Sequence, residues 1–151
     1  MPICLKWLND NVYSIRVAAI TNLKELTKLL GSQWAERNII KNLMDLKNEI
    51  NYLHRLTPLF GIAELSQVIS SDIIKKNFTP MLLQMSKDKI PNIRMNVAKA
   101  IMTIRVNLRN TKFGAIENSI EADLLQILND MKNDPDDDVK FYTKKAIALK
   151  N

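Results

Sequence analysis

The chain has few of the residues that small folds use for turns, cross-links and metal sites. Its 151 residues include one cysteine, one histidine, three glycines and five prolines. A single cysteine excludes an internal disulfide and a zinc site built on several thiolates. The shortage of glycine and proline argues against a β-sandwich or a β-barrel, because these folds need many tight turns.

Long apolar runs are also missing, and none approaches the length of a transmembrane span. The first ten residues, MPICLKWLND, are not basic and lead into no apolar signal region. We therefore expect no membrane association and a location in the cytosol or the nucleus, where a lone cysteine stays reduced. Hydrophobic residues make up 46% of the chain, enough for the core of one globular domain.

The net charge is +6, which is compatible with an acidic partner. The basic residues are spread along the chain and are not interleaved with aromatic residues as in proteins that bind single-stranded nucleic acid. A nucleic-acid-binding role therefore stays a minor alternative.

A repeat with a period near 40 residues is the main signal of the sequence. Arg16, Arg55 and Arg94 stand 39 residues apart, and Lys140 follows 46 residues later. Six residues before these basic positions stand the acids Asp10, Glu49, Asp88 and Asp134. Nine residues before them stand Trp7, Leu46, Met85 and Met131, and twelve before them stand Cys4, Leu43, Leu82 and Leu128. One residue before them stand Ile15, His54, Ile93 and Val139.

The apolar columns step by three and four residues, which is the spacing of one helix face. Each unit is therefore expected to hold a helix A, a turn that carries the acid, and a helix B that carries the basic residue. Neither helix can bury its apolar face alone, so the units must stack. The sequence predicts an all-α, right-handed solenoid of about three and a half helix pairs, in one array over residues 1–151 with units at 1–31 (partial), 32–71, 72–109 and 117–151.

The expected helices cover residues 1–8, 12–30, 34–47, 51–70, 73–86, 92–108, 120–132 and 137–149. Gly31 is expected to cap the second of them. Pro58 predicts a kink or a late start in its helix, because proline lacks the backbone donor. Residues 109–119 are expected to form a longer surface loop. The first unit lacks half of its helix A, so we also expect exposed apolar side chains beside 12–30 and self-association.

Four segments carry a resemblance to a known family. They are WLNDNVYSIR (7–16), NYLHRLTPLF (51–60), NIRMNVAKA (92–100) and DDDVKFYTKKA (136–146). The repeat resembles the HEAT repeat of the armadillo-type fold, and the segments are similar to the C-terminal repeats of the scaffold, or regulatory A, subunits of protein phosphatase 2A. The resemblance implies a non-catalytic scaffold whose C-terminal repeats hold the phosphatase catalytic subunit. It also implies that a regulatory B subunit, which the family's N-terminal repeats hold, is not recruited by this chain alone.

The resemblance further implies where the catalytic subunit is held, namely on the ridge of turns between helix A and helix B. The matching positions are Tyr13, Tyr52, Arg55, Ile90 and Asn92. Exposed aromatic residues and arginine are common anchors of protein interfaces. The alternative is that Arg55 and Asn92 only brace their turns, and that the basic residues and acids form a ladder of charged pairs between successive turns.

The sequence offers no catalytic, cofactor or metal site. His54 occupies an apolar column and is expected to be a packed histidine, and no nucleophile motif or phosphate-binding loop accompanies it. The acids at 136–138 lack the glycine and the distal glutamate of a calcium loop and fit the start of a helix. Trp7 and Trp34 are expected to be packing residues, and Cys4 a buried one.

Two function classes besides the phosphatase scaffold stay open. One is another HEAT-type adaptor, in transport or on microtubules, and the other is the basic nucleic-acid binder. A steep loss of affinity with salt is the mark of the latter, because phosphate contacts release counterions.

Overall fold

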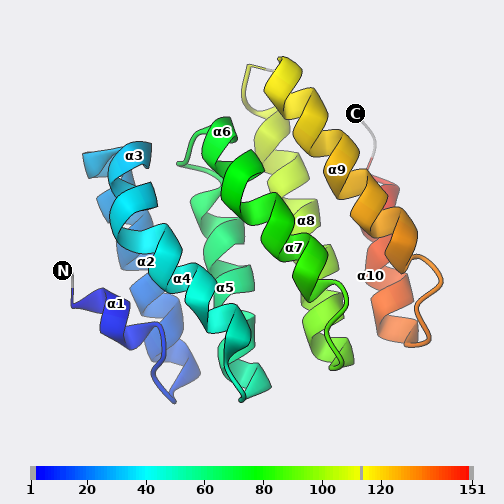
Figure 1. Ribbon diagram of the computed structural model, residues 1–151, viewed down its shortest axis with the longest axis horizontal. Helices are drawn as coiled ribbons and strands as arrows, with labels where there is room; N and C mark the ends of the chain where they lie inside the picture. Colours follow the sequence, from blue (N-terminus) through cyan, green and yellow to red (C-terminus); the bar gives the residue numbers. More distant parts are fainter. Residues whose placement is uncertain (1–2, 113, 150–151) are drawn as a thin grey trace.

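The computed structural model describes residues 3–112 and 114–149, and every regular element in these residues is helical. The helices form two layers, with the A helices in front and the B helices behind in Figure 1. The B helices are α2 (Tyr13–Leu30), α5 (Tyr52–Leu65), α8 (Pro91–Arg109) and α10 (Asp137–Ile147). They pack side by side in that order. The expected all-α solenoid is confirmed, and no helix within the described residues is long and apolar enough to cross a membrane.

The A helices are less regular than the B helices. The first is the short α1 (Cys4–Trp7) and the last is the continuous α9 (Ala115–Met131). The second joins α3 (Ser32–Ala35), the π-helix η1 (Glu36–Ile40), α4 (Lys41–Asp45) and the 3-10 helix η2 (Leu46–Asn48). The third joins α6 (Ser71–Ile73), the π-helix η3 (Ile74–Phe78) and α7 (Thr79–Met85).

The π-helical turns fall at equivalent places in two successive repeats. A π turn shifts the backbone ladder and leaves carbonyls without their usual partner. The side-chain amide of Asn38 donates to the carbonyl of Trp34 at 2.9 Å, and the amide of Asn77 donates to that of Ile73 at 3.2 Å. The two asparagines stand 39 residues apart, so the irregularity is part of the repeat.

The core lies between the two layers and follows the columns that the sequence predicts. The column twelve residues before the basic position is buried throughout, at Cys4, Leu43, Leu82 and Leu128. Ile39, Phe78 and Leu124, four residues further back, are also buried. The interpretation of Cys4 as a buried residue is therefore confirmed.

The outer end of the array departs from these columns. Trp7 keeps 39% of its surface exposed and Ile15 is exposed as well, so Trp7 is not the packing residue that its column predicts. The helices α1 and α2 form this end of the described residues (Figure 1). Trp34, in contrast, packs against the core.

Several expected helix boundaries were wrong. The helix α5 begins at Tyr52 and continues through Pro58, so the late start does not occur, and it ends at Leu65, five residues early. The prediction of a long loop over residues 109–119 is also wrong, because α8 runs to Arg109 and α9 begins at Ala115. A carboxylate oxygen of Glu117 accepts the backbone N–H of Gly114 at 2.9 Å and caps α9 there. Gly31 is the expected cap, with a φ of 89° that favours glycine.

Exposed apolar side chains on and beside α1 and α2 predict self-association of the chain. The exposed apolar side chains on and beside α1 and α2 are Ile3, Trp7, Val12, Leu29 and Leu30. Light scattering over a concentration series is expected to show a rising mass, and Leu29→Ser with Leu30→Ser to reduce the rise. Val106→Ser, on exposed surface of α8, is the control and leaves the rise unchanged. A strictly monomeric chain at high concentration would contradict the prediction.

A close approach between α5 and α4 generates a second prediction. A Cβ atom on Gly61 would lie 2.7 Å from both terminal methyl carbons of Leu43, which is fully buried. We expect Gly61→Ala to lower the free energy of unfolding by about 1 to 3 kcal/mol through overpacking. In a Leu43→Ala background the same change should instead stabilise the helix, because the added methyl then has room. Chemical denaturation measures both, and an equal loss in the two backgrounds would refute the overpacking account.

Candidate protein-binding site

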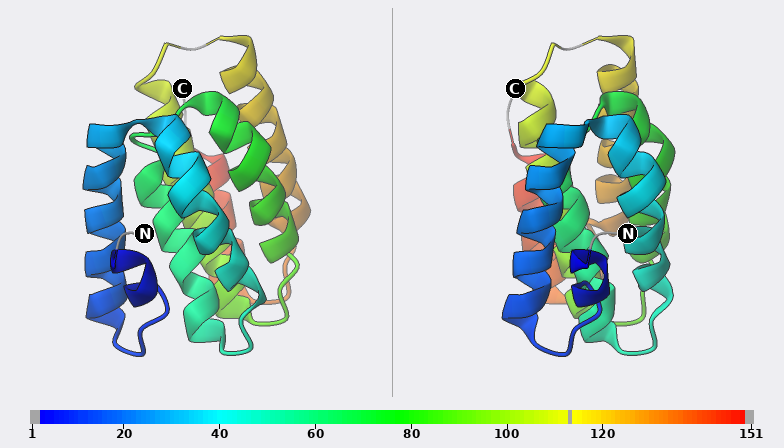
Figure 2. Two further views of the ribbon diagram at one scale, coloured as in Figure 1. Left: turned by 60° about the vertical axis from the view of Figure 1, so that its left-hand side comes forward. Right: turned by 90° about the vertical axis from the view of Figure 1, so that its left-hand side faces the viewer.

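The turns between A and B helices lie in a row along one edge of the molecule, the lower edge in Figures 1 and 2. They span residues 8–12, 49–51, 86–90 and 132–136. We call this edge, with the first turn of each following B helix, the turn ridge. All five predicted binding residues lie on it.

An arginine in each of the first three B helices holds its own turn. Its Nη1 donates to the two backbone carbonyls five and six residues earlier in the chain. Arg16 donates to Asp10 and Asn11 at 2.8 and 3.2 Å, Arg55 to Glu49 and Ile50 at 2.9 Å each, and Arg94 to Asp88 and Lys89 at 2.8 and 3.2 Å. We call this arrangement the arginine clamp. It pairs turn carbonyls that the helices leave without donors.

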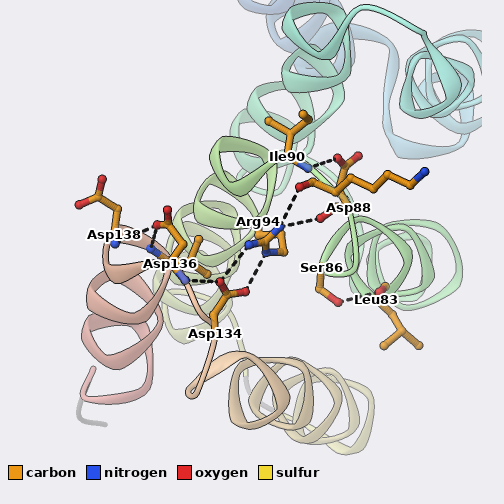
Figure 3. A network of polar contacts seen from close by, with 10 residues as sticks. Leu83, Ser86, Asp88, Ile90, Arg94, Asp134, Asp136 and Asp138 are labelled. Carbon is orange, nitrogen blue, oxygen red and sulfur yellow. Dashed lines mark hydrogen bonds and ion pairs between the residues drawn. The ribbon is translucent and has the colours of Figure 1, made fainter.

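Two of the arginines also reach the acid of the next turn. Arg55 donates Nε and Nη2 to the carboxylate of Asp88 at 3.0 and 3.1 Å, and Arg94 donates the same atoms to Asp134 at 2.7 and 3.0 Å (Figure 3). Each aspartate also accepts the N–H two residues ahead of it, at 2.9 Å. Each carboxylate therefore fixes its own turn and also accepts two hydrogen bonds from the arginine guanidinium of the previous repeat. The ladder of charged pairs is real at these two steps.

The first and last steps of the ladder differ. Arg16 is 5% exposed and forms no ion pair with Glu49; its guanidinium carbon instead lies 5.7 Å from the ring centre of Tyr13. The first turn is tied to α5 by the ring of His54, whose Nδ1 contacts Oδ1 of Asn9. His54 is buried, as a packed histidine should be. Lys140 pairs with Asp137 in its own helix at 2.9 Å.

The predicted binding residues fall into two groups. Tyr13 keeps 57% of its surface exposed although its ring packs edge-on against Phe60, and Tyr52 is also exposed. Ile90 is partly buried against the core. Arg55 is occupied by its clamp and its ion pair, and Asn92 accepts the side-chain amide of Asn96 at its carbonyl and its amide oxygen. Tyr13, Tyr52 and Ile90 keep surface that a partner can contact. Arg55 holds its turn, and the two oxygens of Asn92 bond to Asn96 within α8.

The sequence reasoning missed three apolar residues of the ridge. Ile50, at the tip of the second turn, is 97% exposed, and Val12 and Leu53 are also exposed. Val12 stands at the same repeat position as Ile90, four residues before the arginine, so the column was visible in the sequence. Ile50 stands at the same repeat position as the polar residues Asn11 and Lys89, so the repeat pattern did not indicate an apolar binding residue there.

The comparisons with known proteins agree with the repeat. A family model described as HEAT repeat matches residues 1–30 and 78–104. Among curated proteins, the A-type regulatory subunit of protein phosphatase PP2A from Saccharomyces cerevisiae is 39% identical over 129 residues, 83% of this chain. The protein of the same name from Schizosaccharomyces pombe is 38% identical over 71 residues, 47% of this chain. The chain spans 20% and 12% of the length of these relatives.

A solved structure supports the architecture alone. The chain is similar to a designed armadillo repeat protein with a TM-score of 0.55, over 95% of this chain and 61% of that one. The sequence identity is 15%, so the likeness concerns the stacking of helices.

The partly buried ion pair between Arg94 and Asp134 generates a prediction about pH. The hydrogen bonds from Arg94 hold the pKa of Asp134 below its usual value, and the side chain of Asp134 is only 8% exposed. Because the folded-state pKa is the lower one, Asp134 stabilises the fold above its unfolded pKa of about 4. That contribution is lost as the pH falls through the folded-state value.

We therefore expect Asp134→Asn to lower the free energy of unfolding at pH 7 by about 1 to 3 kcal/mol. The free energy of unfolding of this variant should also fall less steeply than that of the parent chain as the pH drops from neutral to acidic. The remaining amide oxygen of asparagine can still accept the turn N–H, but the amide nitrogen cannot accept from Nε of Arg94, so the change removes the charge and one hydrogen bond of the ion pair. Asp137→Asn is the matched control, since that side chain is 95% exposed, and should cost far less. Denaturant titrations across pH measure both variants, and equal losses would show that the ion pair does not stabilise the fold.

Proposed function

This chain is a HEAT-repeat homologue of the A-type regulatory subunits of protein phosphatase 2A, and we propose that it is a non-catalytic scaffold that binds the catalytic subunit of that phosphatase through its turn ridge. The observation that carries the proposal is the exposure of Tyr13, Ile50 and Tyr52 on a ridge whose turns are fixed by the buried Arg16 and the partly buried Arg55. Exposed apolar anchors on a rigid frame bind a partner with little loss of conformational entropy.

The relatives support the regulatory part of this proposal. They are named as regulatory subunits of the phosphatase, and the match to the yeast protein extends over 83% of this chain. The proposal concerns the catalytic subunit and does not extend to a B subunit. We place the protein in the cytosol or the nucleus, where the lone, buried Cys4 stays reduced.

The physical roles on the ridge differ by residue. Tyr13, Tyr52 and Ile50 supply apolar contact area, and the tyrosines add a hydroxyl at the rim. Ile90 adds a smaller apolar surface, because part of it packs against the core. Arg55 acts through the shape of the ridge, since its guanidinium bonds within the chain, and Asn92 has its oxygens occupied by Asn96.

Truncation of the exposed anchors tests the proposal. We expect Tyr13→Ala and Ile50→Ala each to weaken binding of the purified phosphatase 2A catalytic subunit, by about 1 to 4 kcal/mol. The melting temperature should change little for Ile50→Ala, because this side chain is 97% exposed. Surface plasmon resonance with the immobilised chain measures the affinity, and differential scanning calorimetry the melting temperature.

Two further variants separate binding from folding. Val106→Ala removes an exposed apolar side chain from α8 at a position about 22 Å along the helix from its ridge end, and should leave the affinity unchanged. Arg55→Ala should lower stability and affinity together, because it removes the clamp. If Tyr13→Ala and Ile50→Ala bind as tightly as the parent chain, the ridge is not the binding surface; if the parent chain fails to bind, the partner is another protein and the adaptor alternative is favoured.

A further inference from the structure

A groove of about 400 Å³ crosses the open face of the B-helix layer, away from the turn tips. Its lining comes from α2, α5 and α8, and none of it from an A helix. The apolar part of the lining is Tyr13, Val17, Ile20, Leu59, Phe60, Ala63 and Ala100. The two alanines add only a methyl group each, so the surface between the aromatic residues and α8 remains hollow.

The cations at the α8 end of the groove have no acidic partner in the described part of the chain. Nζ of Lys99 lies 4.3 Å from the ring centre of Tyr142 on α10, and Nζ of Lys145 lies 6.0 Å from the same centre. Neither lysine forms an ion pair within residues 3–112 and 114–149. The one acid among the described lining residues, Glu64, is paired with Lys24 at 2.9 Å on the opposite rim. The groove is therefore apolar at one end and carries unneutralised positive charge at the other.

The repeat places these groups in register. Thr21, Phe60, Lys99 and Lys145 each stand five residues after the basic residue of their repeat. They form one row across the four B helices: a hydroxyl, an aromatic ring and two ammonium groups. Packed helices lie about 8 to 10 Å apart, and an extended chain in the polyproline II conformation advances about 3.1 Å per residue and returns to the same face every three residues. Each step along the row thus corresponds to about three residues of an extended chain.

We propose that this face binds an extended, acidic protein segment that carries one apolar side chain. The apolar side chain enters the groove between Tyr13 and Phe60, and acids about three and six residues away along the segment meet Lys99 and Lys145. Charge complementarity selects the acids, and the solenoid's extended face suits a segment rather than a compact ligand. This surface is separate from the turn ridge except for Tyr13, which borders both, and the proposal does not rest on phosphatase binding.

Fluorescence anisotropy with synthetic peptides tests the proposal without any phosphatase. The probe is a labelled peptide of about nine residues with one leucine and with glutamates three and six positions from it, made in both chain directions. We expect one direction to bind. The same peptide with lysines in place of the glutamates, or with serine in place of the leucine, should bind at least about tenfold more weakly.

Variants of the chain locate the binding. Lys99→Glu combined with Lys145→Glu should lower the affinity for the peptide by about tenfold or more, and Phe60→Ala should lower that affinity as well. Lys41→Glu is the matched charge control, because Lys41 is an exposed residue of α4 in the opposite layer. Circular dichroism melts confirm that each variant is folded, and amide chemical-shift changes in the parent chain should fall on the open face of α2, α5, α8 and α10.

Several results would overturn the proposal. They are absence of binding in both peptide directions, equal losses in Lys41→Glu and the double lysine variant, and shift changes confined to the turn ridge or the A layer. Displacement of the peptide by a single-stranded oligonucleotide at lower concentration would assign the cations to nucleic acid and would also overturn it.

Discussion

The turn ridge depends on the arginine clamp. Each clamp brings a guanidinium to backbone carbonyls that the two helices cannot pair, and so fixes the angle at which helix A passes into helix B. Because Arg55 and Arg94 extend the same group to the next turn's aspartate, the clamp also sets the spacing between repeats. Only arginine has enough donors in one plane for both tasks. The last repeat has Lys140 in place of an arginine. Its turn is held instead by Asp134 and Asp136, whose carboxylates accept backbone N–H groups.

This constraint divides the surface into two faces with different physical character. On the ridge, the arginines and aspartates bond inside the protein, and the large apolar side chains of Tyr13, Ile50 and Tyr52 are exposed beside polar turn residues such as Lys89. On the open face of the B helices, the repeat leaves Lys99 and Lys145 beside an apolar groove, without carboxylate partners among the residues that the structure describes. The ridge suits a large, preformed partner surface, and the open face suits an extended segment. One array can therefore present two independent interfaces.

Most of the fold could be predicted from the sequence because the repeat fixes it. The spacing of the arginines and acids predicted the helix pairs, the buried columns and the charged ladder. The ladder's first step could not be predicted from spacing alone: Glu49 occupies the acid position, but it neither pairs with Arg16 nor accepts a turn N–H as the aspartates do. The early start of α9 depends on a single cap by Glu117. The exposure of Ile50 depends on the tertiary arrangement, which the residues at its repeat position do not encode.

Two of the five predicted binding residues illustrate a further limit of sequence reasoning. Arg55 and Asn92 have the residue types of interface contacts, but the structure uses their polar atoms for bonds within the chain. The sequence left open whether these residues brace their turns or contact a partner, because spacing alone does not give the hydrogen-bond partners of a side chain. Family resemblance marks where a ridge lies, and the geometry decides which of its residues can reach a partner.

Amide hydrogen exchange of the chain with and without the phosphatase 2A catalytic subunit tests the central claim most directly. Our account predicts slower exchange in the complex at the turn tips, residues 10–13, 49–53 and 88–92, with little change along the A helices or on the open face of the B helices. Slowed exchange on either of those surfaces with unchanged turns, or no change anywhere at saturating catalytic subunit, would contradict the account.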